Sequence, residues 1–146
     1  MMKEQNETQG DSVPGDQPAH GGEQTVELFM RDTIAMIDPA MSLRDAAERL
    51  QAAEVGLVVV RADDAVVGVI SERDIVRCVA LGLDLDATTV ATVESEDLKW
   101  ATEGSSVDVV AEEMMENYLR HMLIADDAGQ LVGVLSLRDV VTAYLT

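Results

Sequence analysis

The chain has 146 residues, a formal net charge of −18 at pH 7 and a hydrophobic content of 47%. This length predicts one domain with a core of ordinary size. Because nucleic acids and anionic membranes bind basic surfaces, a charge of this sign excludes both as general partners.

Residues 1–24 contain almost no apolar side chains and are rich in Gln, Gly, Asp, Glu and Pro. Such a segment cannot bury enough apolar surface to offset the entropy that is lost when a chain becomes ordered. We therefore expect a disordered acidic tail over residues 1–24.

Residues 25–84 form a first unit of predicted helices and strands. A short apolar turn or helix over 26–30 precedes a short strand over 33–37. Ser42 and Asp45 have the spacing of a capping box, which predicts that a helix begins here. Apolar residues then follow at the i, i+3, i+4, i+7 spacing of one helix face, namely Leu43, Ala46, Ala47 and Leu50.

A β-hairpin and a second helix complete this unit. The β-branched run over 55–60 predicts a strand buried on both faces, and residues 66–70 return the chain after a turn at Asp63 and Asp64. Ser71 and Asp74 then begin the second helix, which Gly82 ends. The predicted apolar face of this helix consists of Ile75, Val76, Val79 and Ala80.

Residues 85–146 repeat the first unit. Gly68–Asp74 matches Gly133–Asp139 at five of seven positions, 65 residues apart, and upstream residues match at an offset of 64. One extra residue near Gly129 explains the change of offset. The last helix is predicted to carry an apolar face of Val140, Val141, Tyr144 and Leu145.

The repeated unit has the order β-α-β-β-α, which predicts an α/β (α+β) fold with one small sheet in each repeat. Two copies are too few for a solenoid. We expect a pair related by pseudo-two-fold symmetry, packed face to face, with equivalent clefts between the repeats. Trp100, on the first strand of the second repeat, is expected in the core.

The repeated Ser-x-x-Asp pattern at helix starts permits two interpretations. A helix N-terminus offers free backbone N–H groups to an anion, and a carboxylate one turn later can bind a diol. The same residues are also good helix caps, and a serine cap alone stabilises a helix by about 1 kcal/mol. The pattern does not decide between a ligand site and capping alone.

The duplicated Gly-x-x-Ser-x-x-Asp pattern, together with the stretch from Arg120 to Ile124, resembles the cystathionine-β-synthase-type (CBS) domain. The resemblance covers residues 26–146, and the pair is similar to a stand-alone Bateman module. It implies that the hydroxyls of Ser71 and Ser136 contact phosphate. It also implies that the carboxylates of Asp74 and Asp139 accept hydrogen bonds from ribose.

The resemblance further implies that Arg120 and His121, whose counterparts are Gly56 and Leu57, reach a phosphate. Arg73 and Arg138 lie within the motif and pair either with a phosphate or with nearby carboxylates. The implied function is regulatory binding of AMP, ADP, ATP or S-adenosylmethionine, with no other cofactor required. The alternative is a ligand-free dimerising scaffold in which the Ser-x-x-Asp pairs only cap helices.

Other features of the sequence limit the class of protein to which the chain can belong. Walker and Rossmann glycine motifs are missing from the sequence, and two histidines with one cysteine do not form a common zinc cluster. We therefore expect neither an enzyme nor a metal site. The single cysteine and the polar N-terminus predict a cytoplasmic protein. The apolar helix faces predict a homodimer, and the regulated partner is unknown.

Overall fold

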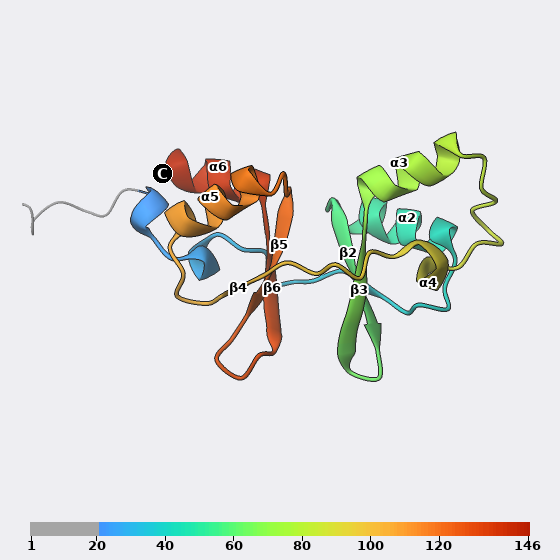
Figure 1. Ribbon diagram of the computed structural model, residues 1–146, viewed down its shortest axis with the longest axis horizontal. Helices are drawn as coiled ribbons and strands as arrows, with labels where there is room; N and C mark the ends of the chain where they lie inside the picture. The colour runs from blue at the N-terminus through green and yellow to red at the C-terminus, as the bar shows by residue number, and fades with distance from the viewer. Residues whose placement is uncertain (1–20) are drawn as a thin grey trace, which may run out of the picture.

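The computed structural model describes residues 21–146, which form two similar halves lying side by side (Figure 1). The first half contains β1 (Met36–Ile37), α2 (Leu43–Ala53), β2 (Leu57–Ala62), β3 (Ala65–Ser71) and α3 (Glu72–Ala80). The second half contains β4 (Trp100–Thr102), α5 (Val107–Glu116), β5 (His121–Ala125), β6 (Leu131–Ser136) and α6 (Leu137–Tyr144). The predicted fold class and the repeated β-α-β-β-α order are confirmed.

Each half contains one three-stranded sheet, with the strand orders β1-β2-β3 and β4-β5-β6. The first two strands pair in parallel and the last two pair in an antiparallel hairpin. The first hairpin turns tightly at Asp63 and Asp64, whose φ angles of 51° and 67° are those of a two-residue hairpin turn. The second hairpin has a longer loop, in which Gly129 has a φ of 81°. The extra residue of the second repeat therefore lies in this loop.

Serine caps fix where the main helices begin. The side chains of Ser42, Ser71 and Ser136 each accept a hydrogen bond from the backbone N–H of the aspartate three residues later. Each aspartate carboxylate accepts the N–H of its serine in return, which completes a capping box. Ser106 caps α5 through the backbone N–H of Val109 alone. All three predicted helix starts are therefore correct.

The short helical segment that precedes each repeat packs on the opposite half. Val26, in η3 (Val26–Leu28), is fully buried in the core of the second half, with α5, α6 and the sheet of that half. Val90, in α4 (Val90–Val93), is fully buried in the core of the first half. In Figure 1 the blue N-terminal turns accordingly lie beside α5 and α6, and α4 lies beside α2. Each half is thus completed by a segment of the other repeat.

The chain that follows each exchanged segment also pairs with the sheet it leaves. The backbone N–H of Arg31 donates to the carbonyl of Val134 on β6, and Val134 donates back, at 2.9 and 3.0 Å. The equivalent pair, Ser95 with Val69 on β3, has the same two hydrogen bonds at 2.9 and 3.0 Å. The pseudo-two-fold symmetry therefore also relates the two connecting segments. The edge strands β3 and β6 lie close to the middle of the molecule (Figure 1).

Residues 21–24 correct the predicted extent of the tail. They belong to an ordered segment that includes η2 (Gly21–Glu23), in which Gly21 and Gly22 are buried. A side chain at Gly21 would overlap the backbone of Ala143, so the segment packs tightly against α6. The remainder of the predicted tail, residues 1–20, lies outside the described residues.

The helix faces predicted to be apolar are only partly buried. On α3, Val76 and Val79 are 67% and 57% exposed, and Cys78 is the buried residue. On α6, Val141 and Tyr144 are 51% and 48% exposed, whereas Val140 and Ala143 are buried. The small sheet of each half has room for only one row of side chains from each helix. Spare apolar surface therefore remains on α3 and α6, but not on α2, where Ala46 and Leu50 are buried.

The expectation for Trp100 was wrong, because its side chain is 37% exposed on β4. Within residues 21–146, no helix combines the length and the apolar character required to span a bilayer.

Candidate functional site

A large cleft lies between the two halves, with a volume of about 1550 Å³. A pocket for a single small ligand typically has about 300–1,000 Å³, so the cleft has room for more than one such molecule. The starts of β2 and β5 form its walls together with the first turns of α3 and α6. Because the halves are related by pseudo-two-fold symmetry, equivalent positions of both repeats face the same space.

The structure brings all eight sequence-predicted ligand residues to this one cleft. They are Ser71, Arg73, Asp74, Arg120, His121, Ser136, Arg138 and Asp139. The two predicted clefts therefore merge into one. The sequence analysis missed two further basic residues of the cleft wall, Arg31 and Lys99. Their rarity in an acidic chain is the signal that could have identified them.

Both Ser-x-x-Asp pairs have the same local geometry. The hydroxyls of Ser71 and Ser136 donate to Oδ2 of Asp74 and Asp139 at 2.9 Å, and each accepts the backbone N–H of its aspartate at 3.1 Å. One carboxylate oxygen and the serine hydroxyl are therefore engaged within each cap. The other carboxylate oxygen, Oδ1, therefore determines which hydrogen bonds each aspartate can accept from a ligand.

Basic residues are concentrated at the cleft. Five of the ten Lys and Arg residues of the chain line it, compared with five of the 28 Asp and Glu residues. The basic residues are Arg31, Arg73, Lys99, Arg120 and Arg138, and the acidic residues are Glu54, Glu72, Asp74, Asp97 and Asp139. A chain with a strong excess of acid thus has a cleft of balanced charge.

Four of these five basic residues have no partner among residues 21–146, and Lys99 pairs with Asp97. Within residues 21–146, the side chains of the four cleft arginines, Arg31, Arg73, Arg120 and Arg138, form no ion pair and no hydrogen bond. Each arginine outside the cleft has a partner: Asp86 for Arg44, the Met36 carbonyl for Arg49, the Met36 sulfur for Arg61 and Asp74 for Arg77. Exposed guanidinium groups without a partner in the protein are free to form hydrogen bonds with an anion.

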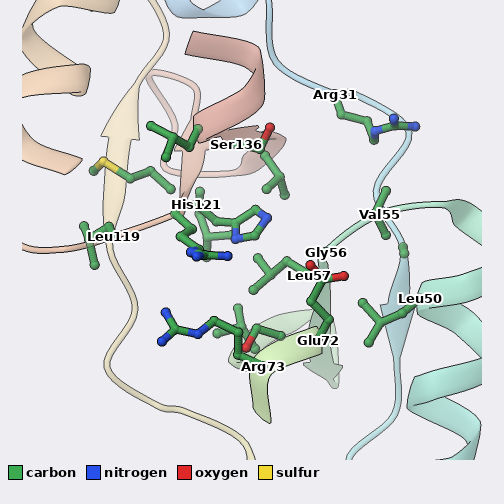
Figure 2. Close-up of a pocket in the computed structure, with 18 of the residues that line it drawn as sticks. Arg31, Leu50, Val55, Gly56, Leu57, Glu72, Arg73, Leu119, His121 and Ser136 are labelled. Atoms are coloured by element: carbon green, nitrogen blue, oxygen red, sulfur yellow. The ribbon is translucent and has the colours of Figure 1, made fainter. Parts of the chain in front are cut away.

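His121 lies at the contact between the halves. A side chain at Gly56 would come within 3.2 Å of two imidazole atoms of His121, so the glycine allows this close approach. Figure 2 shows the imidazole reaching from β5 toward Gly56 and toward Leu57 at the start of β2, with Ser136 beside it. Burial lowers the pKa of His121, and the carboxylates of Glu72 and Asp139 oppose this shift only in part. At neutral pH the imidazole is therefore uncharged and offers a hydrogen bond rather than a positive charge.

In the described part of the chain, no group of three or more His, Cys, Asp or Glu residues is placed to hold a metal ion. Carboxylates, hydroxyls and guanidinium groups thus provide the polar chemistry of the cleft. This set can bind a phosphate through the arginines and a sugar diol through an aspartate.

Comparison with known proteins agrees with this geometry. The family model of the CBS domain matches the chain twice, over residues 26–81 and 90–146, and the chain therefore belongs to the CBS-domain family. An uncharacterized 17.7 kDa protein of Acidianus ambivalens is 34% identical over 113 residues, which are 77% of this chain and 68% of that protein.

Two solved structures resemble the fold closely. A CBS-domain-containing protein from Agrobacterium tumefaciens superposes with a TM-score of 0.78 at 28% identity, covering 87% of this chain and 98% of that one. A CBS domain protein from Pyrobaculum aerophilum, solved in complex with AMP, superposes with a TM-score of 0.73 at 30% identity. That comparison covers 84% of this chain and 98% of the other.

Proposed function

We propose that this chain is a regulatory module, not an enzyme, that binds an adenosine-containing ligand in the cleft between its repeats. The observation that carries the proposal is the set of four unpaired arginines around one cleft in a chain with a net charge of −18. Four guanidinium groups without a hydrogen-bond partner in the protein are able to bind an anionic ligand such as AMP, ADP or ATP. The AMP complex of the Pyrobaculum aerophilum relative supports the same class of ligand.

In this proposal each group of the cleft has a role. Arg120 and the motif arginines, Arg73 and Arg138, hold the phosphate, and His121 adds a neutral hydrogen bond. The motif aspartates accept the hydroxyls of the ribose, and apolar side chains such as Leu98 and Leu119 enclose the base. S-adenosylmethionine shares the nucleoside part but carries a positive charge, so the unpaired arginines favour the nucleotides over it.

Binding acts on function by shifting an equilibrium. A ligand changes the state of a protein only when it binds one of two conformations more tightly than the other. The cleft is formed by both halves, so a ligand that bridges them favours one arrangement of the halves. A partner that recognises this arrangement would then sense the concentration of the nucleotide.

The test measures the binding of AMP, ADP, ATP, S-adenosylmethionine and adenosine by calorimetry and thermal shift. Arg120→Ala should weaken AMP binding about tenfold or more, as expected for a lost hydrogen bond between charged groups. Adenosine binding should change much less, because adenosine has no phosphate. Arg44→Ala is the matched control, because Arg44 is exposed, pairs with Asp86 and does not line the cleft.

A ligand-free scaffold remains the second candidate function. Its supporting observation is that both Ser-x-x-Asp pairs form complete capping boxes, so the caps explain these residues without any ligand. Absence of both heat and thermal shift with every adenosine compound at millimolar concentration would favour the scaffold. Mass spectrometry of small molecules released from the purified protein would identify a ligand that is already bound.

We also propose that the chain forms a homodimer through α3 and α6. Val76 on α3 is equivalent to Val141 on α6, and Val79 is equivalent to Tyr144, and all four side chains are about half exposed or more. Two matching apolar patches on one molecule suit a symmetric interface in which each patch meets its counterpart on a second copy. Light scattering that gives the monomer mass of 15.7 kDa at micromolar concentration would contradict this proposal.

A further inference from the structure

The two repeats place different charges on equivalent helices. From the first residue of each helix, α2 and α5 show the same order of buried and exposed side chains over ten equivalent positions. The fold therefore makes the same demand on both helices. Arg44 and Arg49 of α2 nevertheless correspond to Asp108 and Glu113 of α5, and all four side chains are exposed. Packing within the chain does not account for these two reversals of charge.

The total charge of the two helix pairs differs as well. α2 and α3 together contain four basic and four acidic residues, so their net charge is zero. α5 and α6 contain one basic residue, Arg138, and five acidic residues, so their net charge is −4. Four of these acidic residues are on α5, which has no basic residue. The apolar patches of α3 and α6 therefore lie in different electrostatic surroundings.

The acidic helix α5 borders the apolar patch of α6. The hydroxyl of Tyr144, which belongs to this patch, donates a hydrogen bond to the carboxylate of Asp108 at the start of α5. The side chains of Glu112, Glu113 and Glu116 are exposed and have no hydrogen-bond or ion-pair partner among residues 21–146. Charges act over about 8 Å at physiological ionic strength. A second surface that packs on α6 therefore experiences the negative charge of α5.

Both apolar patches lie on the same side of the molecule, because α3 and α6 both run above the two sheets in the view of Figure 1. One second copy can therefore cover both patches in either of two orientations. In a head-to-head dimer, α3 meets α3 and α6 meets α6. In a head-to-tail dimer, α3 of each copy meets α6 of the other. The apolar contact is similar in both, because Val76 and Val79 of α3 are equivalent to Val141 and Tyr144 of α6.

Charge distinguishes the two orientations. Head-to-head association places a helix pair with a charge of −4 against an identical pair, and like charges that face one another destabilise an interface. Head-to-tail association places each pair with a charge of −4 against a pair with a net charge of zero. The helix that contains Arg44 and Arg49 then approaches the helix that contains Asp108 and Glu113. The repulsion between equivalent surfaces is absent from this second arrangement.

We propose that two copies of this chain associate head to tail, so that α3 of each copy packs on α6 of the other. The acidic α5 of each copy then lies beside α2, and not beside α5, of the other. This inference rests on the homodimer proposed above and names the surfaces that meet. Each contact occurs twice about one two-fold axis, so the assembly is closed and contains only two chains.

Cysteine cross-linking tests the orientation. Val76 of α3 and Val141 of α6 occupy equivalent positions and are 67% and 51% exposed. Each is replaced by Cys in a Cys78→Ala background, a change that copies Ala143 at the equivalent position of α6. With a short bismaleimide, Val76→Cys chains alone and Val141→Cys chains alone should not form cross-linked dimers. An equal mixture of the two should form them.

A chain with both cysteine substitutions is the positive control, because it should cross-link in either orientation. Glu113→Arg is an independent measurement, since it gives α5 the residue that α2 has at the equivalent position. In the head-to-tail dimer this side chain faces a neutral helix pair, and the dissociation constant from analytical ultracentrifugation should change by less than about twofold. In a head-to-head dimer the same change would relieve repulsion and tighten association by about two- to fivefold.

The outcomes separate this inference from the homodimer on which it rests. If either single-cysteine chain cross-links with itself, or if Glu113→Arg tightens the dimer, the head-to-tail orientation is overturned and the homodimer stands. If the positive control has the mass of a dimer but does not cross-link, another surface forms the interface, and this inference is again overturned. A mass of 15.7 kDa for the wild-type protein would refute the homodimer and this inference together.

Discussion

The exchanged segments allow a prediction about which part of the molecule each one stabilises. Val26 and Val90 are both fully buried, and each packs in the core of the opposite half. Replacing either with Ala removes two methyl groups, which is about 1.6 kcal/mol of transfer free energy at about 0.8 kcal/mol for each group. The cavity that remains raises the expected loss to about 2–3 kcal/mol. For a domain of this size the melting temperature should fall by about 6–15 °C.

The assay combines urea denaturation with hydrogen exchange measured by mass spectrometry. Val26→Ala should increase exchange in α5 and α6, whereas Val90→Ala should increase exchange in α2 and α3. Leu28→Ala is the control, because Leu28 lies in the same short helix as Val26 but is 64% exposed, and it should change the stability by less than about 0.5 kcal/mol. The reasoning is refuted if Val26→Ala loosens α2 and α3 instead, or if it costs no more than Leu28→Ala.

Three further predictions concern pH and assembly. Because burial lowers the folded-state pKa of His121, the unfolded chain takes up this proton first, so the free energy of unfolding should fall as the pH drops below 6.5. His121→Gln should flatten this part of the pH profile, and identical profiles for the two proteins would contradict the assignment. Burial also raises the pKa of Glu94, which occupies the position equivalent to Met30. Glu94→Met should therefore increase the urea concentration at the midpoint of unfolding at pH 7. The increase should be smaller at about pH 4, where the carboxyl is largely protonated. An equal increase at both pH values would show that the charge of Glu94 does not affect the stability. Val79→Asp and Val141→Asp should each convert a homodimer into monomers, and a light-scattering mass that stays at twice 15.7 kDa would place the interface elsewhere.

The candidate site was predictable as a set of residues but not as an arrangement. The duplication identified Ser71, Asp74 and their equivalents, and the resemblance to the CBS domain pointed to Arg120. The sequence placed the motifs in two equivalent clefts, whereas the structure merges them into one. The protonation state of His121 depends on its burial, and this burial results from the packing of one half against the other.

Local interactions decided the parts of this fold that the sequence predicts by itself. A serine followed three residues later by aspartate begins a helix because both hydrogen bonds form within one turn, and alternating or continuous apolar runs specify strands in the same local way. The 64- and 65-residue offsets therefore established the two units and their order of elements. Only the tertiary structure decided which segment of the other repeat completes the core of each unit.

The exchange of Val26 and Val90 between halves illustrates this difference. Both valines have the same local pattern, and packing on either half would satisfy it equally well, so the choice depends on the path of the connecting chain. The exposed sides of α3 and α6 were decided in the same way, because a sheet of three short strands buries only one row from each helix. The packing of all the elements together determines which apolar side chains remain exposed, and no sequence pattern predicts it.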